Sequence, residues 1–261
     1  EGPQAITVTA TDAAGNSAEV SVAYVVDNTP PHISIAAPVD GSCLRAVDLP
    51  DGAFTVSDNL DDNPQTAESG WSSDEGLHTY TVTATDRAGN EANRSVSYRV
   101  DDSPPAIDVV ATPAANSRGW NNTDVTVGFT CSDGGCGVAQ CPEDIVLTNE
   151  GAGQAVSGTA VDDAGNSAEA TVSVDIDKTP PVLSVSSPSD GMTTYNASIT
   201  VSGTASDALS GMLSVTVNGI NVTLAGGAFE QELTLAEGDN EISVTGIDNA
   251  DNQVSATITV T

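Results

Sequence analysis

Basic residues are scarce in this chain of 261 residues. It has six lysines and arginines against 37 aspartates and glutamates, which gives a formal net charge of −31, and Lys178 is its only lysine. Proteins that bind nucleic acid need Lys and Arg to neutralise the phosphates, so this composition excludes nucleic acid as a partner. Acid in such excess repels itself unless cations neutralise part of it.

Other absences exclude further classes of function. Aromatic residues make up 3% of the chain, too few for a sugar-stacking platform, and the only histidines are His32 and His78. Neither histidine lies in a catalytic setting, so we expect no enzyme. A Cys-x-x-Cys-His motif is absent, and no glycine-rich motif precedes a predicted helix, so we expect neither haem nor nucleotide.

The chain also lacks long apolar segments. No run of 18 apolar residues occurs, and no basic segment leads into an apolar one, so we expect neither membrane insertion nor a signal peptide. Hydrophobic residues nevertheless make up 38% of the chain, which is enough to form cores. We therefore expect folded domains rather than disorder.

A six-residue motif recurs four times. Its second residue is always aspartate and its last is always asparagine, and these aspartates lie 74, 76 and 86 residues apart. A recurrence at this period indicates tandem structural repeats. The copies are Thr11-Asp12-Ala13-Ala14-Gly15-Asn16, Thr85-Asp86-Arg87-Ala88-Gly89-Asn90, Val161-Asp162-Asp163-Ala164-Gly165-Asn166 and Ile247-Asp248-Asn249-Ala250-Asp251-Asn252.

Three further markers recur in a fixed order with this motif. They are a Glu-Gly pair upstream of it, an Asp-x-Thr/Ser-Pro-Pro segment downstream, and a Ser-Asp pair some 26 to 28 residues after the prolines. We therefore predict three repeats, 29–102, 103–178 and 179–261, preceded by the final third of another at 1–28. The markers are Glu1, Glu75, Glu150 and Glu237; Asp27, Asp101 and Asp177; and Asp58, Asp133 and Asp207.

Apolar and polar residues alternate on both sides of each six-residue motif. Examples are Ile6, Val8 and Ala10 before it, and Val22 and Tyr24 after it. This period of two predicts half-buried strands, and the Gly-Asn pair between them is typical of a turn. A further hairpin is expected at Asn218-Gly219. No helical period appears, so the predicted fold is all-β: tandem immunoglobulin-like (Ig-like) β-sandwiches in an elongated array.

The Thr-Asp-x-Ala-Gly-Asn hairpin followed by Asp-x-Thr-Pro-Pro resembles bacterial Ig-like tandem domains, relatives of the HYR-type modules of secreted and cell-surface proteins. The segment from Gly119 to Pro142 is similar to one subtype of these domains. Repeat 179–261 is similar to an Ig-like subtype that also occurs beside glycan-degrading enzymes. The resemblance implies a fold rather than a function, because such modules serve as stalks, adhesin arms and enzyme spacers.

Ig-like topology would bring the recurring aspartates together at the junctions between repeats. Oxygen-rich loops with several carboxylates suit calcium, so we predict a calcium ion at each junction. The alternative is that each aspartate serves only its own turn through bonds to the backbone. The predicted ligands are Asp27, Asp58 and Asp86; Asp101, Asp102, Asp133 and Asp162, with Asp163 as a further candidate; and Asp177, Asp207 and Asp248, with Asp175.

The four cysteines suggest two disulfides in a secreted chain. In the Ig-like topology, Cys131 and Cys141 would tie the two sheets of repeat 103–178. The same topology would bring Cys43 close to Cys136 in the next repeat. A Cys131–Cys136 bond or free thiols are the alternatives, whereas the spacing and the absence of a nearby histidine argue against zinc.

These features predict a stalk segment or adhesin arm of a secreted or cell-surface bacterial protein, with neighbouring repeats as its partners. A first alternative is an extracellular filament, in which strands from an identical subunit complete the hairpin 1–28. A second alternative is an accessory module whose loops bind a surface glycan or protein.

Overall fold

The computed structural model describes all 261 residues, and they form an all-β chain of 22 strands with one short 3-10 turn, Ala46–Asp48. Contacts divide it into two units. The first unit comprises Glu1–Ala106, Ser132–Gln140 and Val161–Ala168, and the second comprises Ile107–Cys131, Cys141–Ala160 and Glu169–Thr261. The loops at one end of repeat 103–178 therefore belong to the first unit. No helix is long and apolar enough to cross a membrane.

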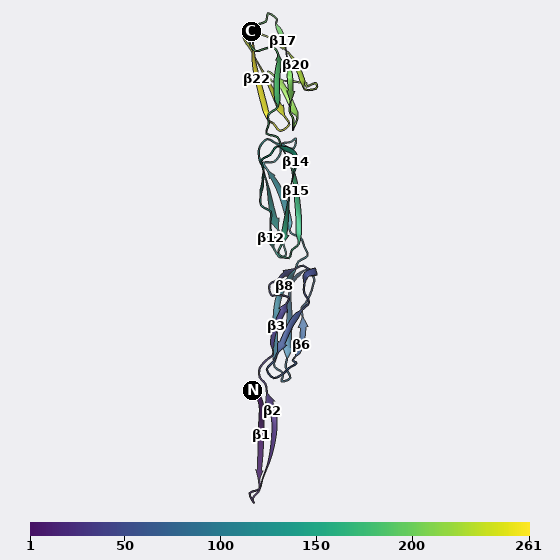
Figure 1. Ribbon diagram of the computed structural model, residues 1–261, viewed down its shortest axis with the longest axis vertical. Coiled ribbons are helices and arrows are strands. Elements are labelled where there is room, and N and C mark those ends of the chain that lie inside the picture. The colour runs from purple at the N-terminus through teal and green to yellow at the C-terminus, as the bar shows by residue number, and fades with distance from the viewer. The chain divides into compact units, whose positions relative to one another are not determined.

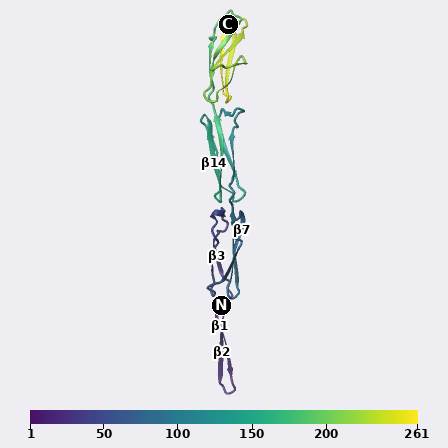
Figure 2. The ribbon, with the colours of Figure 1, turned by 90° about the vertical axis from the view of Figure 1, so that its right-hand side faces the viewer.

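The first unit begins with a two-stranded hairpin (Figures 1 and 2). Strands β1 (Gly2–Thr11) and β2 (Ser17–Val26) pair antiparallel, with Ile6 opposite Val22 and Thr7 opposite Ser21. One face of this hairpin is therefore apolar and the other carries hydroxyl groups, as the alternation predicts.

A sandwich of two sheets follows in the first unit. Its core packs Ile33 and Phe54 of one sheet against Tyr80, Val82 and Tyr98 of the other. Strand β3, for example, lies against both β7 and β8. The sheets are β3 (His32–Ala37) with β5 (Ala53–Ser57), and, in order, β4 (Cys43–Leu44), β8 (Glu91–Val100), β7 (Gly76–Thr85) and β6 (Gln65–Ser69).

The chain segment from 106 to 176 forms a second pair of sheets. Val127 and Phe129 of β11 pack with Val156 of β14 and Val174 of β15 in its core. The sheets are, in order, β13 (Ile145–Leu147), β11 (Val125–Ser132) and β9 (Ala106–Thr112); and β10 (Trp120–Asn121), β15 (Ser167–Ile176), β14 (Gly151–Asp162) and β12 (Val138–Gln140).

The last sandwich lies wholly in the second unit. Val201 and Phe229 of one sheet pack against Val215, Val244 and Val260 of the other. The predicted hairpin at Asn218-Gly219 is confirmed, since it joins β18 to β19. The sheets are β16 (Val182–Ser187), β17 (Ser198–Ser206) and β20 (Ala228–Thr234); and β19 (Ile220–Val222), β18 (Met212–Val217), β21 (Asn240–Asp248) and β22 (Gln253–Val260).

The predicted fold class is thereby confirmed: the chain consists of tandem β-sandwiches of Ig-like character. Each six-residue motif forms the tight turn of a long hairpin. In the turn between β7 and β8, the N–H of Gly89 donates to the carbonyl of Asp86 and the N–H of Asp86 to that of Asn90. The predicted repeat boundaries stay predictions.

Candidate functional site at the repeat junctions

Nine recurring aspartates gather into three groups. In each group, one carboxylate oxygen from each of three aspartates lies within 4.8 Å of the others. The first two groups belong to the first unit and the third to the second unit. Each group joins an aspartate that follows a long strand to one from the Ser-Asp loop and one from the hairpin turn of the next repeat. The groups are Asp27, Asp58 and Asp86; Asp101, Asp133 and Asp162; and Asp177, Asp207 and Asp248.

The hairpin aspartate of each group binds its own turn. Asp86 accepts the N–H of Asn90 on Oδ1 and the Asn90 side-chain amide on Oδ2, both at 2.8 Å. Asp162 with Asn166, and Asp248 with Asn252, repeat this arrangement. Burial raises the pKa of Asp86, but these bonds and the N–H groups of Gly89 and Ala88 outweigh it and hold the pKa below its usual value. These bonds directly support the alternative that each hairpin aspartate stabilises its own turn.

The asparagine of the motif also reaches the preceding repeat. The side-chain amide of Asn90 donates to the carbonyl of Asp27 at 3.2 Å. Asn166 donates to the carbonyl of Asp101 and Asn252 to that of Asp177, both at 2.8 Å. One asparagine thus ties its own turn to the linker before it. Sequence reasoning missed this role, although the presence of asparagine in all four copies of the motif was a usable signal.

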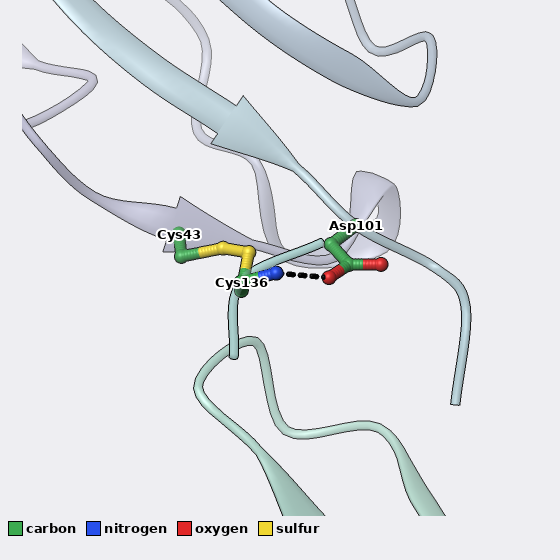
Figure 3. A group of neighbouring side chains, drawn as sticks. All are labelled: Cys43, Asp101 and Cys136. Carbon is green, nitrogen blue, oxygen red and sulfur yellow. Dashed lines mark hydrogen bonds between the residues drawn. A yellow bond between two sulfur atoms is a disulfide. The ribbon is translucent and has the colours of Figure 1, made fainter. Parts of the chain in front are cut away.

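The linker aspartate holds the loop of the next repeat. Asp101 accepts the N–H of Ser103 on Oδ1 at 3.1 Å. On Oδ2 it accepts the N–H of Cys136 at 2.7 Å (Figure 3). Asp177 likewise accepts the N–H groups of Thr179 and Ser210. At Asp101 this approach depends on Gly135, because a Cβ there would overlap the carboxylate.

The glutamate of the first three Glu-Gly pairs has a role that its recurrence alone did not reveal. Its carboxylate accepts the hydroxyl of the linker residue before Pro-Pro. The bonds join Glu1 to Thr29, Glu75 to Ser103 and Glu150 to Thr179, at 2.5, 2.7 and 2.9 Å. The bond from the Thr29 hydroxyl, with the N–H of Asn28, holds the pKa of Glu1 below its usual value.

Three aspartates that we expected at the junctions lie outside the groups. Asp102 accepts the N–H of Ala46 at 2.9 Å, and Asp175 accepts the N–H of Gly153. Asp163 is exposed. Asp102 and Asp163 directly follow the grouped Asp101 and Asp162, and side chains alternate in direction along extended chain, so these neighbouring carboxylates face different surroundings. Asp175 lies two positions before Asp177 and binds within its own repeat instead.

No grouped aspartate is paired with a basic side chain. The chain has four salt bridges, Arg45–Asp48, Arg87–Asp61, Arg118–Asp251 and Lys178–Asp124, and none involves a grouped aspartate. In the first group, Oδ2 of Asp58 is buried without a hydrogen-bond partner, while Oδ1 accepts the N–H groups of Leu60 and Asp61. A carboxylate has about four lone-pair sites, so these bonds leave oxygens free for a hard cation such as Ca²⁺.

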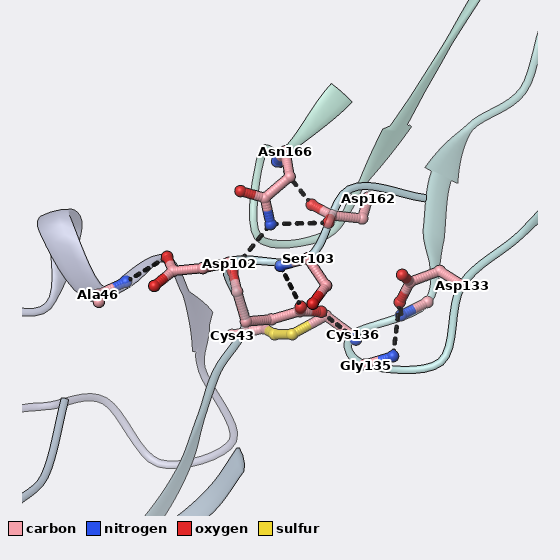
Figure 4. Close-up of a disulfide and its surroundings, with 11 residues drawn as sticks. Cys43, Ala46, Asp102, Ser103, Asp133, Gly135, Cys136, Asp162 and Asn166 are labelled. Carbon is pink, nitrogen blue, oxygen red and sulfur yellow. Dashed lines mark hydrogen bonds between the residues drawn. A yellow bond between two sulfur atoms is a disulfide. The ribbon is translucent and has the colours of Figure 1, made fainter. Parts of the chain in front are cut away.

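Both cysteine pairs that the Ig-like topology implied are joined in the structure. Cys43 of β4 is bonded to Cys136, with 6.1 Å between their Cα atoms (Figure 3). Cys131 is bonded to Cys141, with 5.8 Å between their Cα atoms. The first pair lies beside Asp101, Asp133 and Asp162, so this junction has a covalent link in addition to its hydrogen bonds (Figure 4).

Sequence comparison relates parts of the chain to known proteins. Residues 181–261 match the family model described as glucodextranase, domain B. This match supports an Ig-like family for the last repeat, whereas the HYR-like subtype stays a prediction. The curated relative bacillopeptidase F of Bacillus subtilis (strain 168) is 30% identical over 110 residues, which is 42% of this chain. The chain spans only 8% of the length of that protein.

Several solved structures resemble the chain at low identity. The fibronectin(III)-like modules of Clostridium thermocellum CbhA are 19% identical, with a TM-score of 0.32 over 59% of this chain and 93% of theirs. Titin domains I67–I69 are 10% identical, with a TM-score of 0.48 over 90% and 99%. Mouse cadherin-23 EC22–24 is 13% identical, with a TM-score of 0.32 over 89% and 98%. We draw no functional conclusion from similarities at this level.

Proposed function

We propose that the chain is a structural or adhesive segment, a stalk or adhesin arm, of a secreted or cell-surface bacterial protein. In this proposal its Ig-like repeats set reach and spacing, and calcium and disulfides limit bending at the junctions. The observation that carries the proposal is the gathering of three carboxylates at each junction, with no basic side chain paired to them. We propose no catalytic role.

Calcium fits the donor set better than other common ions. Each group offers carboxylate oxygens on loops, and calcium accepts six to eight oxygens in flexible geometry, including carbonyls and water. The proposed ligands are Asp27, Asp58 and Asp86 at the first junction and their counterparts in the other two groups. Three negative charges within 4.8 Å repel one another. A divalent cation between them would attract all three carboxylates and offset this repulsion.

Thermal unfolding with calcium and with chelator tests this proposal. A ligand that binds only the native state raises its stability, by about 2.7 kcal/mol at a hundredfold excess over Kd. We therefore expect a higher Tm in calcium, and three ions per chain by titration calorimetry. D58N should reduce the count to two, whereas the matched variant D102N should leave it at three. A Tm that is the same in calcium and in chelator would contradict the proposal.

The filament is a second candidate, and the hairpin 1–28 has an apolar face that it could use. Ile6 and Val22 are 58% and 61% exposed, whereas the corresponding Tyr80 and Val96 are 0% and 7% exposed in the complete sandwich. Strands from an identical subunit could cover this face by strand addition. Sedimentation velocity should then show concentration-dependent assembly that V22K abolishes. A monomer at every concentration would exclude this candidate.

The match of residues 181–261 to domain B of glucodextranase favours an accessory module as a third candidate. In this case the repeat would bind a surface glycan or protein beside an enzyme. Glycan-array binding by the full chain would support this candidate, and the absence of binding to any array glycan would count against the glycan form.

A further inference from the structure

The fourth copy of the six-residue motif departs from the other three. Its fifth residue is Asp251, where the other copies have glycine, at Gly15, Gly89 and Gly165. All four residues adopt the left-handed conformation, with φ of 70° for Asp251 and 88° to 95° for the glycines. This conformation brings a Cβ close to the following carbonyl, so glycine suits it best and aspartate carries strain there. Such an exception points to a role for the side chain.

The Asp251 carboxylate contacts a loop of the preceding repeat. Arg118 donates through Nη2 to Oδ1 of Asp251, and Asn116 donates through Nδ2 to Oδ2 at 2.8 Å. The same two side chains also bind the carbonyl of Asn249, both at 2.9 Å. Two side chains of the loop between β9 and β10 thus donate to both Asp251 and the carbonyl of Asn249 in the turn between β21 and β22. All of these residues lie within the second unit.

The donor loop is held in shape for this contact. Oδ1 of Asn116 accepts the N–H groups of Arg118 and Trp120, at 3.0 and 3.1 Å, and the N–H of Gly119 donates to the carbonyl of Asn116. The side chain of Asn116 therefore binds its own loop with its oxygen and the next repeat with its nitrogen. An interaction with a preformed loop loses less conformational entropy when it forms.

The loop lies next to the position that corresponds to Cys43 at the previous junction. Cys43 pairs with Arg99 in the short parallel ladder β4–β8, and Trp120 pairs with Asp175 in the corresponding ladder β10–β15. Arg118 thus lies two residues before the counterpart of Cys43. Where Cys43 bonds the next repeat covalently, Asn116 and Arg118 bind it through charge and hydrogen bonds.

We propose that Asn116, Arg118 and Asp251 form an ionic clamp that fixes repeat 179–261 to repeat 103–178, and that the strained aspartate is retained for this contact. The clamp needs neither metal nor disulfide, so it is independent of the calcium proposal. Its side chains are only partly covered, 30% exposed for Arg118 and 49% for Asp251, so salt weakens it.

A double-mutant cycle in the full chain, in chelator, tests the clamp. The variants are R118Q, D251N and their combination; asparagine tolerates the left-handed conformation, so D251N removes the charge and keeps the turn. We expect R118Q to raise hydrogen exchange of the 249–252 amides about three- to tenfold, towards the lower end of the range of coupled contacting pairs because the clamp is partly exposed. The same substitution should have a smaller effect in the D251N background, where only the bond from Arg118 to the carbonyl of Asn249 is left to lose, and 1 M NaCl should reproduce most of the loss.

R94Q is the matched control, since Arg94 is exposed and forms no salt bridge; it should leave the exchange unchanged. Residual dipolar couplings add an orientational readout: one alignment tensor should describe both repeats in the native chain, and two tensors should be needed in R118Q. Additive effects of R118Q and D251N, or no effect of either, would show that Asp251 serves only its own turn and would overturn the proposal.

Discussion

Single aspartates and asparagines connect the repeats through bonds of modest individual strength. Hydrogen bonds to an ionised carboxylate contribute roughly 1.5–3 kcal/mol each, and Asp86 accepts several. Because the same Asn90 amide that binds Asp86 also reaches the carbonyl of Asp27, loss of the turn would also loosen the linker. The hairpin turn and the junction are therefore held by the same hydrogen-bonded side chains.

The lowered pKa of Asp86 predicts an acid-sensitive first unit. A carboxyl with a folded-state pKa below its unfolded value stabilises the fold above the unfolded pKa, near 3.8, and loses this contribution as the pH falls through the folded pKa. We expect D86N to lower the Tm at pH 6. Below pH 4, the Tm of D86N should decrease less steeply with pH than the Tm of the native chain. Thermal unfolding from pH 2 to 7 measures this. D62N, at an exposed site, is the control and should keep the native profile.

At the scale of strands, one buried tyrosine links β7 to β6. Tyr80 is fully buried and donates its hydroxyl to Glu68 at 2.5 Å. Burial, with the Glu68 carboxylate, raises the pKa of Tyr80 to about 12. Its contribution to stability is then complete below pH 10 and is lost as the pH rises from 10 towards 12.

Alkaline difference absorbance of the phenolate tests this assignment. One tyrosine should ionise near pH 12, and E68Q should lower that transition while burial still keeps it above the usual 10. Y80F should remove the late transition altogether. A late transition that persists in Y80F would place the raised pKa on another tyrosine.

Close packing between strands makes one glycine of β14 sensitive to substitution. A Cβ at Gly158 would lie 2.6 Å from Cε1 of Phe129 and 2.7 Å from Cγ of Pro142. We expect G158A to cost about 1–3 kcal/mol of unfolding free energy, since overpacked cores lose about that much. Urea unfolding measures it. G134A, at a site with open space, should be nearly neutral, and equal costs for the two variants would contradict this explanation.

The long hairpins could be predicted from sequence because alternation and turn chemistry are local signals. The two-residue strands β4 and β10 could not, since they exist only through parallel pairing with β8 and β15 far along the chain. The three aspartate groups could be predicted because the aspartates recur in every repeat and Ig-like topology brings them to the junctions. The inclusion of Asp102 as a ligand stays a prediction: its carboxylate accepts the N–H of Ala46, and a run of two aspartates does not reveal which side chain joins a group.

The Cys43–Cys136 bond changes how the whole chain would respond to pulling. It closes a loop of 93 residues, and extended chain reaches about 3.6 Å per residue, so reduction should release roughly 330 Å of length. Single-molecule stretching of C131S/C141S with and without reductant isolates this bond. C43S/C136S is the control, and its reductant-dependent gain should be only some 35 Å, from the loop that Cys131–Cys141 closes. A gain of only some 35 Å in the native chain would indicate that Cys43 and Cys136 are unpaired.

That same bond also constrains how a repetitive gene could change. Most repeats in a tandem array can be copied, lost or exchanged singly, because each carries its own core. The predicted repeats 29–102 and 103–178 differ, since each holds one half of the Cys43–Cys136 pair and a lone copy would expose an unpaired thiol. We therefore expect these two repeats to be duplicated or lost together. Gene rearrangements should have their boundaries before residue 29 or after residue 178, rather than between the two repeats.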